Sequence, residues 1–226
     1  MARPTVIRHG AVAIRVSDDP AGDIARSLAV RVRGAIKRRG SASIAISGGS
    51  AAPSMLAAFV HEELDWGRLT VWQVDERVAP DGHDDRNAEQ LWFMPCASTL
   101  MPVTDLDLAE ASARYASTLP DRFDAVHLGL GADGHTASWP PAPHADVDVA
   151  ASARAVEMVG EFNGRARMTL TARPVNRARA RLVLTTGPGK AHMVRRFLDR
   201  DAELPISLVH RSSTTLFVDP AAASAL

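Results

Sequence analysis

A histidine lies inside a glycine-rich segment, GLGADGHTAS, at residues 129–138. The apolar run that precedes it, residues 125–130, predicts a buried strand that ends at these glycines. Glycines let the backbone turn sharply and approach a ligand closely. His135 carries an imidazole, the side chain that exchanges protons near neutral pH. The segment therefore predicts acid/base chemistry on a small bound molecule.

Three other polar or glycine-rich segments also follow apolar, strand-like runs. They are SGGS at residues 47–50, DER at residues 75–77 and TGPGK at residues 186–190. The carboxyl ends of parallel strands meet at one edge of a sheet, where α/β proteins bind their ligands. The four segments are therefore expected to surround one crevice.

The SGGS segment precedes a helix predicted to begin near Pro53. Its backbone amides, at Gly48 and Gly49 among others, and the hydroxyls of Ser47 and Ser50 suit a phosphate at the positive end of that helix. A tight turn with a capping serine is the alternative. Because the GxSxG elbow of serine hydrolases is absent, the serines are interpreted as ligand contacts rather than nucleophiles.

Charged residues follow two of the strands. Lys190 could reach the crevice as a point charge or lie on the surface. Side chains alternate along a strand, so at least one of Asp75, Glu76 and Arg77 should face the crevice. A weak surface salt bridge among the three is the alternative.

The spacing of Gly129, Gly131 and Gly134 also matches the GxGxxG fingerprint of dinucleotide-binding proteins. That fingerprint requires a helix to open at the third glycine. Trp139 and the prolines at residues 140–141 break the chain within one turn, so the dinucleotide interpretation is rejected.

Other clusters predict no ligand. The DGHDD segment at residues 81–85 has one histidine and is interpreted as a solvated loop rather than a metal site. The basic runs at residues 37–39 and 177–181 contain no interleaved aromatic residues, so they are interpreted as solvated helix ends rather than nucleic-acid patches. The single cysteine, Cys96, is expected to be a small core residue.

The elements that must position these residues alternate between strands and helices. Strands are predicted at residues 44–46, 71–74, 125–130, 182–185 and 216–218, with further strands at 11–16 and 155–159. Helices are predicted at residues 24–37, 53–64, 109–119 and 191–198, and a loop at residues 140–148. This βαβα order predicts one α/β domain, residues 1–226, with a mainly parallel sheet.

Composition excludes several classes of protein. Lysine and arginine number 26, as do aspartate and glutamate, so no global field favours nucleic acid or an anionic membrane. No apolar stretch approaches the ~20 residues of a membrane span, and the first residues, MARPTVIRHG, lack the apolar centre typical of a signal peptide. A soluble, cytoplasmic protein is expected.

Taken together, the motifs resemble those of the 6-phosphogluconolactonases over nearly the whole chain. The shared features are the SGG loop, DER followed by Pro80, the GxGxDGHTAS loop, the RxTLT segment at residues 167–171 with Asn176 nearby, TGPGK, and the LPISLV and FVDPAAA segments near the end. The chain departs from the family pattern in two places. SGGSAAP replaces the usual SGGSTP, and Arg86 stands where a serine often precedes Asn87.

The resemblance implies a Rossmann-like three-layer sandwich that hydrolyses 6-phospho-D-glucono-1,5-lactone in the pentose phosphate pathway, without a metal or cofactor. It implies His135 as general acid/base, with Asp75 and Arg77 also catalytic. Substrate or phosphate binding is expected from Ser47, Gly48, Gly49, Ser50, Asn87, Gly131, Asp133, Gly134, Arg167 and Lys190. Asp133 either holds the imidazole or only fixes the turn, and a monomer or weak dimer without nucleic-acid or membrane partners is expected.

Two alternatives stay open. In a glucosamine-6-phosphate deaminase or isomerase, which resembles the lactonases in several motifs, Asp75 would be the base. Arg77 and the TAS that follows His135 favour the lactonase. A non-catalytic phosphosugar-binding module is the second alternative.

Overall fold

The computed structural model describes residues 4–141 and 149–226 and contains a sheet of eight strands. In chain order these are β1 (Thr5–His9), β2 (Val12–Val16), β3 (Ala42–Ile46), β4 (Leu69–Gln73), β6 (Ala97–Thr99), β7 (Ala125–Gly129), β10 (Arg181–Thr185) and β11 (Thr214–Val218). Their order across the sheet is β1-β2-β11-β10-β7-β3-β4-β6. β1 and β2 are antiparallel and every other pair is parallel, so the predicted mainly parallel sheet is confirmed.

Apolar side chains on both faces explain why the strands read as continuous apolar runs. In β3, Ile44 and Ile46 belong to one core cluster and Ala45 to the other. In β10, Leu182 and Leu184 similarly face away from Val183. Strands buried on both faces are typical of parallel sheets covered by helices.

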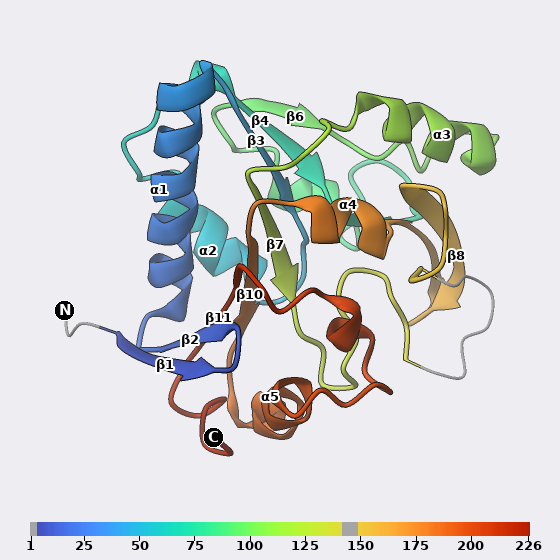
Figure 1. Ribbon diagram of the computed structural model, residues 1–226. Coiled ribbons are helices and arrows are strands. Elements are labelled where there is room, and N and C mark those ends of the chain that lie inside the picture. The colour runs from blue at the N-terminus through green and yellow to red at the C-terminus, as the bar shows by residue number, and fades with distance from the viewer. Residues whose placement is uncertain (1–3, 142–148) are drawn as a thin grey trace.

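Helices cover the two faces (Figure 1). α1 (Pro20–Arg39) and α2 (Ala52–Phe59) pack on one face, and α3 (Leu108–Thr118), α4 (Ala172–Arg177) and α5 (Ala191–Leu198) contribute to the core on the other. Short 3₁₀ helices are η1 (Trp66–Arg68), η2 (Asn87–Gln90), η3 (Pro188–Lys190) and η4 (Pro205–Leu208). The expected three-layer sandwich is confirmed.

Capping explains where α1 begins and ends. The Asp19 carboxylate accepts a hydrogen bond from Gly22 N at 2.8 Å, so the helix starts before the first periodic apolar residue, Ile24. Gly40 ends it in the left-handed conformation, with φ 81°. Helix α2 stops at Phe59, short of the predicted residue 64, and α4 was not predicted.

A second, antiparallel sheet lies beside the first. The strand predicted at residues 155–159 belongs to it, whereas its other two strands were not predicted. Its order is β5 (Asp75–Arg77), β9 (Arg165–Leu170) and β8 (Val156–Phe162). Val74 connects the two sheets, because its N–H donates to Ile46 O at 2.9 Å and its carbonyl accepts from Leu170 N at 2.7 Å. DER therefore forms a strand of the second sheet rather than the end of β4. The predicted loop at 140–148 lies outside the described residues from residue 142 onward.

Candidate active site

A cavity of about 240 Å³ lies at the carboxyl ends of β3, β7 and β10, beside β5. The strand order reverses here, because the chain runs from β3 to β4 and later returns through β7 on the other side of β3. Such a switch point is the usual ligand site of open α/β sheets. Eleven of the expected site residues line it, namely Ser47, Gly48, Gly49, Ser50, Asp75, Arg77, Asn87, Gly131, His135, Arg167 and Lys190.

His135 is held by its neighbour Asp133. The imidazole, whose side chain is 30% exposed, contacts the Asp133 carboxylate through Nδ1. A carboxylate only accepts hydrogen bonds, so Nδ1 carries the hydrogen and Nε2 is left as an acceptor. Burial raises the pKa of Asp133, but the charge and hydrogen bonds of His135 outweigh this and lower the net pKa. Asp133 therefore stays ionised and orients the ring.

Two glycines make room for this pair. Gly131 N donates to His135 O at 2.8 Å, and a Cβ on Gly131 would overlap both the imidazole and the Asp133 carboxylate. Gly134 has φ +86°, and a Cβ there would lie 2.6 Å from the Leu204 side chain. Gly134 and Asp133 support the turn and are not among the residues that line the cavity.

Asp75 joins the segments that meet at the cavity. Its two carboxylate oxygens accept hydrogen bonds from Ser47 Oγ and Ser138 Oγ, each at 2.8 Å. Its backbone carbonyl accepts one from Asn87 Nδ2 at 2.9 Å. The side chain is buried and ties the SGGS loop to the histidine segment.

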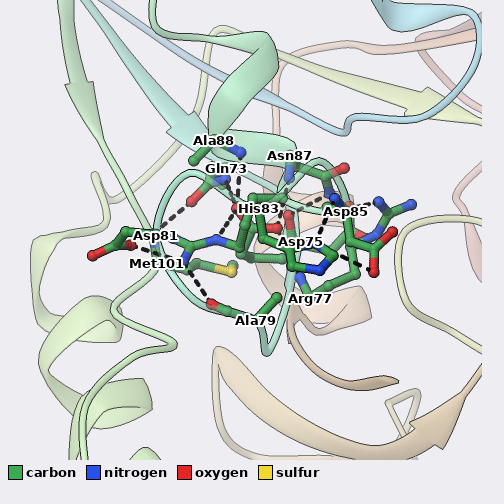
Figure 2. Close-up of polar contacts among 12 residues, drawn as sticks. Gln73, Asp75, Arg77, Ala79, Asp81, His83, Asp85, Asn87, Ala88 and Met101 are labelled. Carbon is green, nitrogen blue, oxygen red and sulfur yellow. Dashed lines mark hydrogen bonds and ion pairs between the residues drawn. The ribbon is translucent and has the colours of Figure 1, made fainter. Parts of the chain in front are cut away.

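The next residue, Glu76, is fully buried on the other side of β5, where Figure 2 shows the surrounding polar contacts. Its carboxylate accepts hydrogen bonds from Gln73 Nε2 (2.7 Å) and from the backbone N–H groups of Arg77 (2.8 Å), Asn87 (2.7 Å) and Ala88 (2.8 Å), and it forms an ion pair with Arg86 Nε (3.1 Å). The strand alternation expected for DER is thus observed. The alternative of a surface salt bridge among Asp75, Glu76 and Arg77 is wrong, because both carboxylates are buried and Glu76 pairs with Arg86 instead.

Three cations line the cavity, and Asp75 is the one acidic residue among the residues that line it. Arg77 and Arg167 are paired across β5 and β9. Burial lowers the pKa of Arg167, and the charge of Arg77 lowers it further. Burial also lowers the pKa of Lys190, against the opposing charge of Asp133. An excess of positive charge in a confined cavity suits an anionic ligand.

The SGGS loop leads into the start of α2, which has no side-chain cap at Ala51. Gly49 adopts φ 109°, a conformation that glycine tolerates, and Ser50 is exposed beside it. The uncapped N–H groups and the helix dipole together favour a bound anion at this end of the cavity.

The sequence interpretation missed several residues that line the cavity. Asn163 comes from a segment that was assigned no role. Thr185 and Thr186 lie in a predicted strand and in the TGPGK segment but were given no role of their own, and His127 was treated only as part of a strand. His127 interrupts the apolar run at residues 125–130, and strand alternation puts it on the same face as Gly129. This polar residue within an apolar run was the feature of the sequence that could have identified His127 as a site residue.

The other residues singled out in the sequence lie outside the cavity and make contacts within the protein. In the DGHDD loop, Arg165 contacts Asp85 (Nε to Oδ2, 2.9 Å) and His83 (3.2 Å), and no group of three metal-ligating side chains occurs within residues 4–141 and 149–226. The run at residues 177–181 is not wholly solvated, because Arg181 is buried and donates to the carbonyls of residues 176, 178 and 212. It thereby satisfies carbonyls where α4 ends.

Cys96 is half-buried, and burial raises the pKa of its thiol to about 11.

Comparisons with known proteins show similarity to one family over most of the chain. The family model described as glucosamine-6-phosphate isomerases/6-phosphogluconolactonase matches residues 16–218. A 6-phosphogluconolactonase of Rhizobium meliloti is 30% identical over 215 residues, covering 85% of this chain and 90% of that protein. One of Pseudomonas putida is 32% identical over 200 residues, covering 82% and 83%.

Solved structures share the fold. The crystal structure of a 6-phosphogluconolactonase from Shewanella baltica matches with a TM-score of 0.83 at 22% identity, covering 95% of this chain and 100% of that chain. A monomeric glucosamine-6-phosphate deaminase matches with a TM-score of 0.79 at 19% identity, covering 96% and 100%.

Proposed function

We infer that this chain, which belongs to the glucosamine-6-phosphate isomerase/6-phosphogluconolactonase family, hydrolyses 6-phospho-D-glucono-1,5-lactone to 6-phospho-D-gluconate in the oxidative pentose phosphate pathway. The observation that carries the proposal is a histidine whose Nδ1 is fixed by a carboxylate, beside a cavity lined by three cations. Two of the curated relatives at 30% identity or more carry the name of this activity.

In the proposed mechanism, His135 Nε2 takes a proton from the water that attacks the lactone carbonyl carbon, C1. The bond between C1 and the ring oxygen then breaks, and the same imidazole returns the proton to the departing oxygen. Asp133 keeps the ring in the required tautomer throughout. One histidine thus serves both proton transfers.

The polar and charged groups of the cavity bind two different parts of the substrate, the lactone carbonyl and the phosphate. Amides of the glycine loop or the Arg77 guanidinium stabilise the negative oxygen of the tetrahedral intermediate. Lys190, the SGGS loop and Arg167 hold the phosphate, and that binding positions C1 against His135. Asp75 is kept as a catalytic residue of the proposal, and its two oxygens also hold the hydroxyls of Ser47 and Ser138 at the cavity.

A coupled assay that follows 6-phosphogluconate formation, with spontaneous hydrolysis subtracted, tests this function. Acceleration above the spontaneous rate is the expected result. Release of ammonia from glucosamine 6-phosphate would instead establish the deaminase alternative. Binding of 6-phosphogluconate without any turnover would establish a binding module.

The proposal extends to the setting of the enzyme. We propose one domain over residues 1–226, acting in the cytoplasm as a monomer or weak dimer with no nucleic-acid or membrane partner. The balanced charge supports this, with 26 basic and 26 acidic residues. Within the part of the chain that the structure describes, no helix has the length and apolar character needed to cross a membrane.

Replacing Gly131 by alanine is expected to lower kcat by about 10²-fold, because the added methyl group displaces His135 and Asp133 from their contact. Steady-state kinetics measures the loss. Gly67→Ala is the matched control, since a Cβ there meets only Asp65 at 3.8 Å. Equal activity of the two variants would show that the ring position is unimportant.

Replacing Lys190 by alanine is expected to raise KM for the phosphorylated lactone by about 10- to 100-fold, the usual worth of a charge-assisted hydrogen bond. The measurement is a comparison with D-glucono-1,5-lactone, which lacks the phosphate and should show no such change. A KM that stays constant for the phosphorylated substrate would return Lys190 to a surface role.

A further inference from the structure

His127 borders the cavity but has no part in the mechanism above. It lies in the middle of β7, directly between Ile46 of β3 and Leu182 of β10, and only 1% of the residue is exposed. Both strand neighbours are apolar. A buried imidazole in such surroundings needs a hydrogen-bond partner for each of its nitrogens.

One nitrogen has its partner in the SGGS loop. His127 Nδ1 lies 3.1 Å from Ser47 O, and Ser47 N in turn donates to His127 O at 3.1 Å. A carbonyl oxygen only accepts, so Nδ1 carries the hydrogen of the neutral ring. Burial lowers the pKa of His127 to about 4, against the opposing effect of the Ser47 hydrogen bond, so the ring is neutral at pH 7.

The other nitrogen is therefore an acceptor. Nε2 is buried and has no hydrogen-bond partner among the residues that the structure describes. The ring cannot turn to find one without losing its bond to Ser47. Two further unpartnered atoms belong to residues that line the same cavity, Arg77 Nε, which is a donor, and Asn87 Oδ1, which is an acceptor.

We propose that His127 Nε2 accepts a hydrogen bond from a ring hydroxyl of the bound sugar lactone and so helps to set specificity for polyhydroxylated substrates. The proposal rests on the proposed function of the site. A dianionic phosphate has no hydrogen to donate, whereas every free hydroxyl of the sugar has one. A site that pairs a buried acceptor with a substrate hydroxyl discriminates strongly against analogues lacking that hydroxyl.

Two near-isosteric variants separate the two nitrogens of His127. In His127→Asn the amide nitrogen takes the place of Nδ1 and keeps the bond to Ser47 O, but nothing replaces Nε2. In His127→Gln the amide oxygen reaches the place of Nε2, but the donor to Ser47 O is lost. We expect His127→Asn to weaken binding of 6-phospho-D-gluconate by about tenfold and to raise KM for the lactone similarly, while His127→Gln stays within about threefold of the parent.

The experiment combines calorimetric binding of 6-phospho-D-gluconate and lactone kinetics for the parent and both variants, with thermal unfolding to verify folding. Absence of turnover in the parent rejects the proposed function, whereas the binding ratio of the two variants tests His127 independently. Unchanged binding in His127→Asn, or loss confined to His127→Gln, would show that the residue only holds the SGGS loop.

A second measurement needs no variant. Binding of monodeoxy analogues of 6-phospho-D-gluconate to the parent protein should show one hydroxyl whose removal weakens affinity by about tenfold or more. In folded His127→Asn the same removal should have little further effect, as a double-mutant cycle requires. If no single hydroxyl matters to the parent protein, the proposal is wrong.

Discussion

His135→Ala lowers kcat for lactone hydrolysis by about 10²- to 10⁴-fold, the usual contribution of a general base. The variant keeps the cavity, its three cations and the SGGS loop, so KM and the binding of 6-phosphogluconate change little. Steady-state kinetics over the spontaneous background measures the rate. A loss in kcat without a loss in binding is the signature of a group that acts on the reacting atoms.

His61→Ala is the control for this variant, because His61 is exposed and does not line the cavity. It should leave kcat and KM unchanged.

Asp133→Asn should lower kcat as well, since an amide no longer secures the hydrogen of His135 on Nδ1. Near-normal turnover in His135→Ala would remove the imidazole from the mechanism and leave electrostatic stabilisation by the cations as the main effect.

Glu76→Ala should lower the free energy of unfolding by about 3–5 kcal/mol, the cost of removing one partner of a buried ion pair. The substitution leaves Arg86, whose side chain is only 4% exposed, without its buried carboxylate. It also leaves the N–H groups of Asn87 and Ala88 without their acceptor. Urea unfolding, followed by circular dichroism, measures the change from the shift of the midpoint.

Asp81→Ala provides the matched control. Asp81 contacts the same guanidinium as Glu76, at 2.9 Å, but its side chain is 81% exposed. Solvent screening reduces the worth of such a pair to below about 1 kcal/mol. If the two variants prove equally stable, the buried network around Glu76 does not hold η2 in place.

The central strands of the main sheet were predictable from sequence because they are buried on both faces, whereas the largely exposed edge strands β1 and β6 were not predicted. Continuous apolar runs such as the one through Ile44 and Ile46 are distinctive, and polar segments mark their carboxyl ends. The second sheet was predicted only in part, because the expected strand at residues 155–159 forms most of β8. β5 has three residues, all charged, and lacks the composition of a strand. β9 alternates polar and apolar residues, a pattern typical of a half-buried strand that the sequence interpretation overlooked.

The sequence predicted which residues form the candidate site more fully than it predicted the contacts between them. Strand ends and the family resemblance pointed to His135, Arg77 and Lys190, and the structure brings them to one cavity. Contacts such as the one from Asp133 to His135 depend on the exact turn geometry, which glycine composition alone does not specify. His127 was overlooked because a polar residue in an apolar strand looks, in sequence, like an ordinary core histidine.

Strand β5 limits the tolerance of the chain to insertions and deletions. Because alternate side chains of this strand serve the cavity and the buried network, adding or deleting a single residue between β4 and β5 would exchange the two faces. With one residue added, Glu76 would take the place of Arg77 and bring its negative charge into the anion site. With one residue deleted, Arg77 would take the place of Glu76 and be buried beside Arg86. Catalytic geometry and folding are thus under the same length constraint here, whereas changes of length in the exposed turn at residues 61–65 carry no such double penalty.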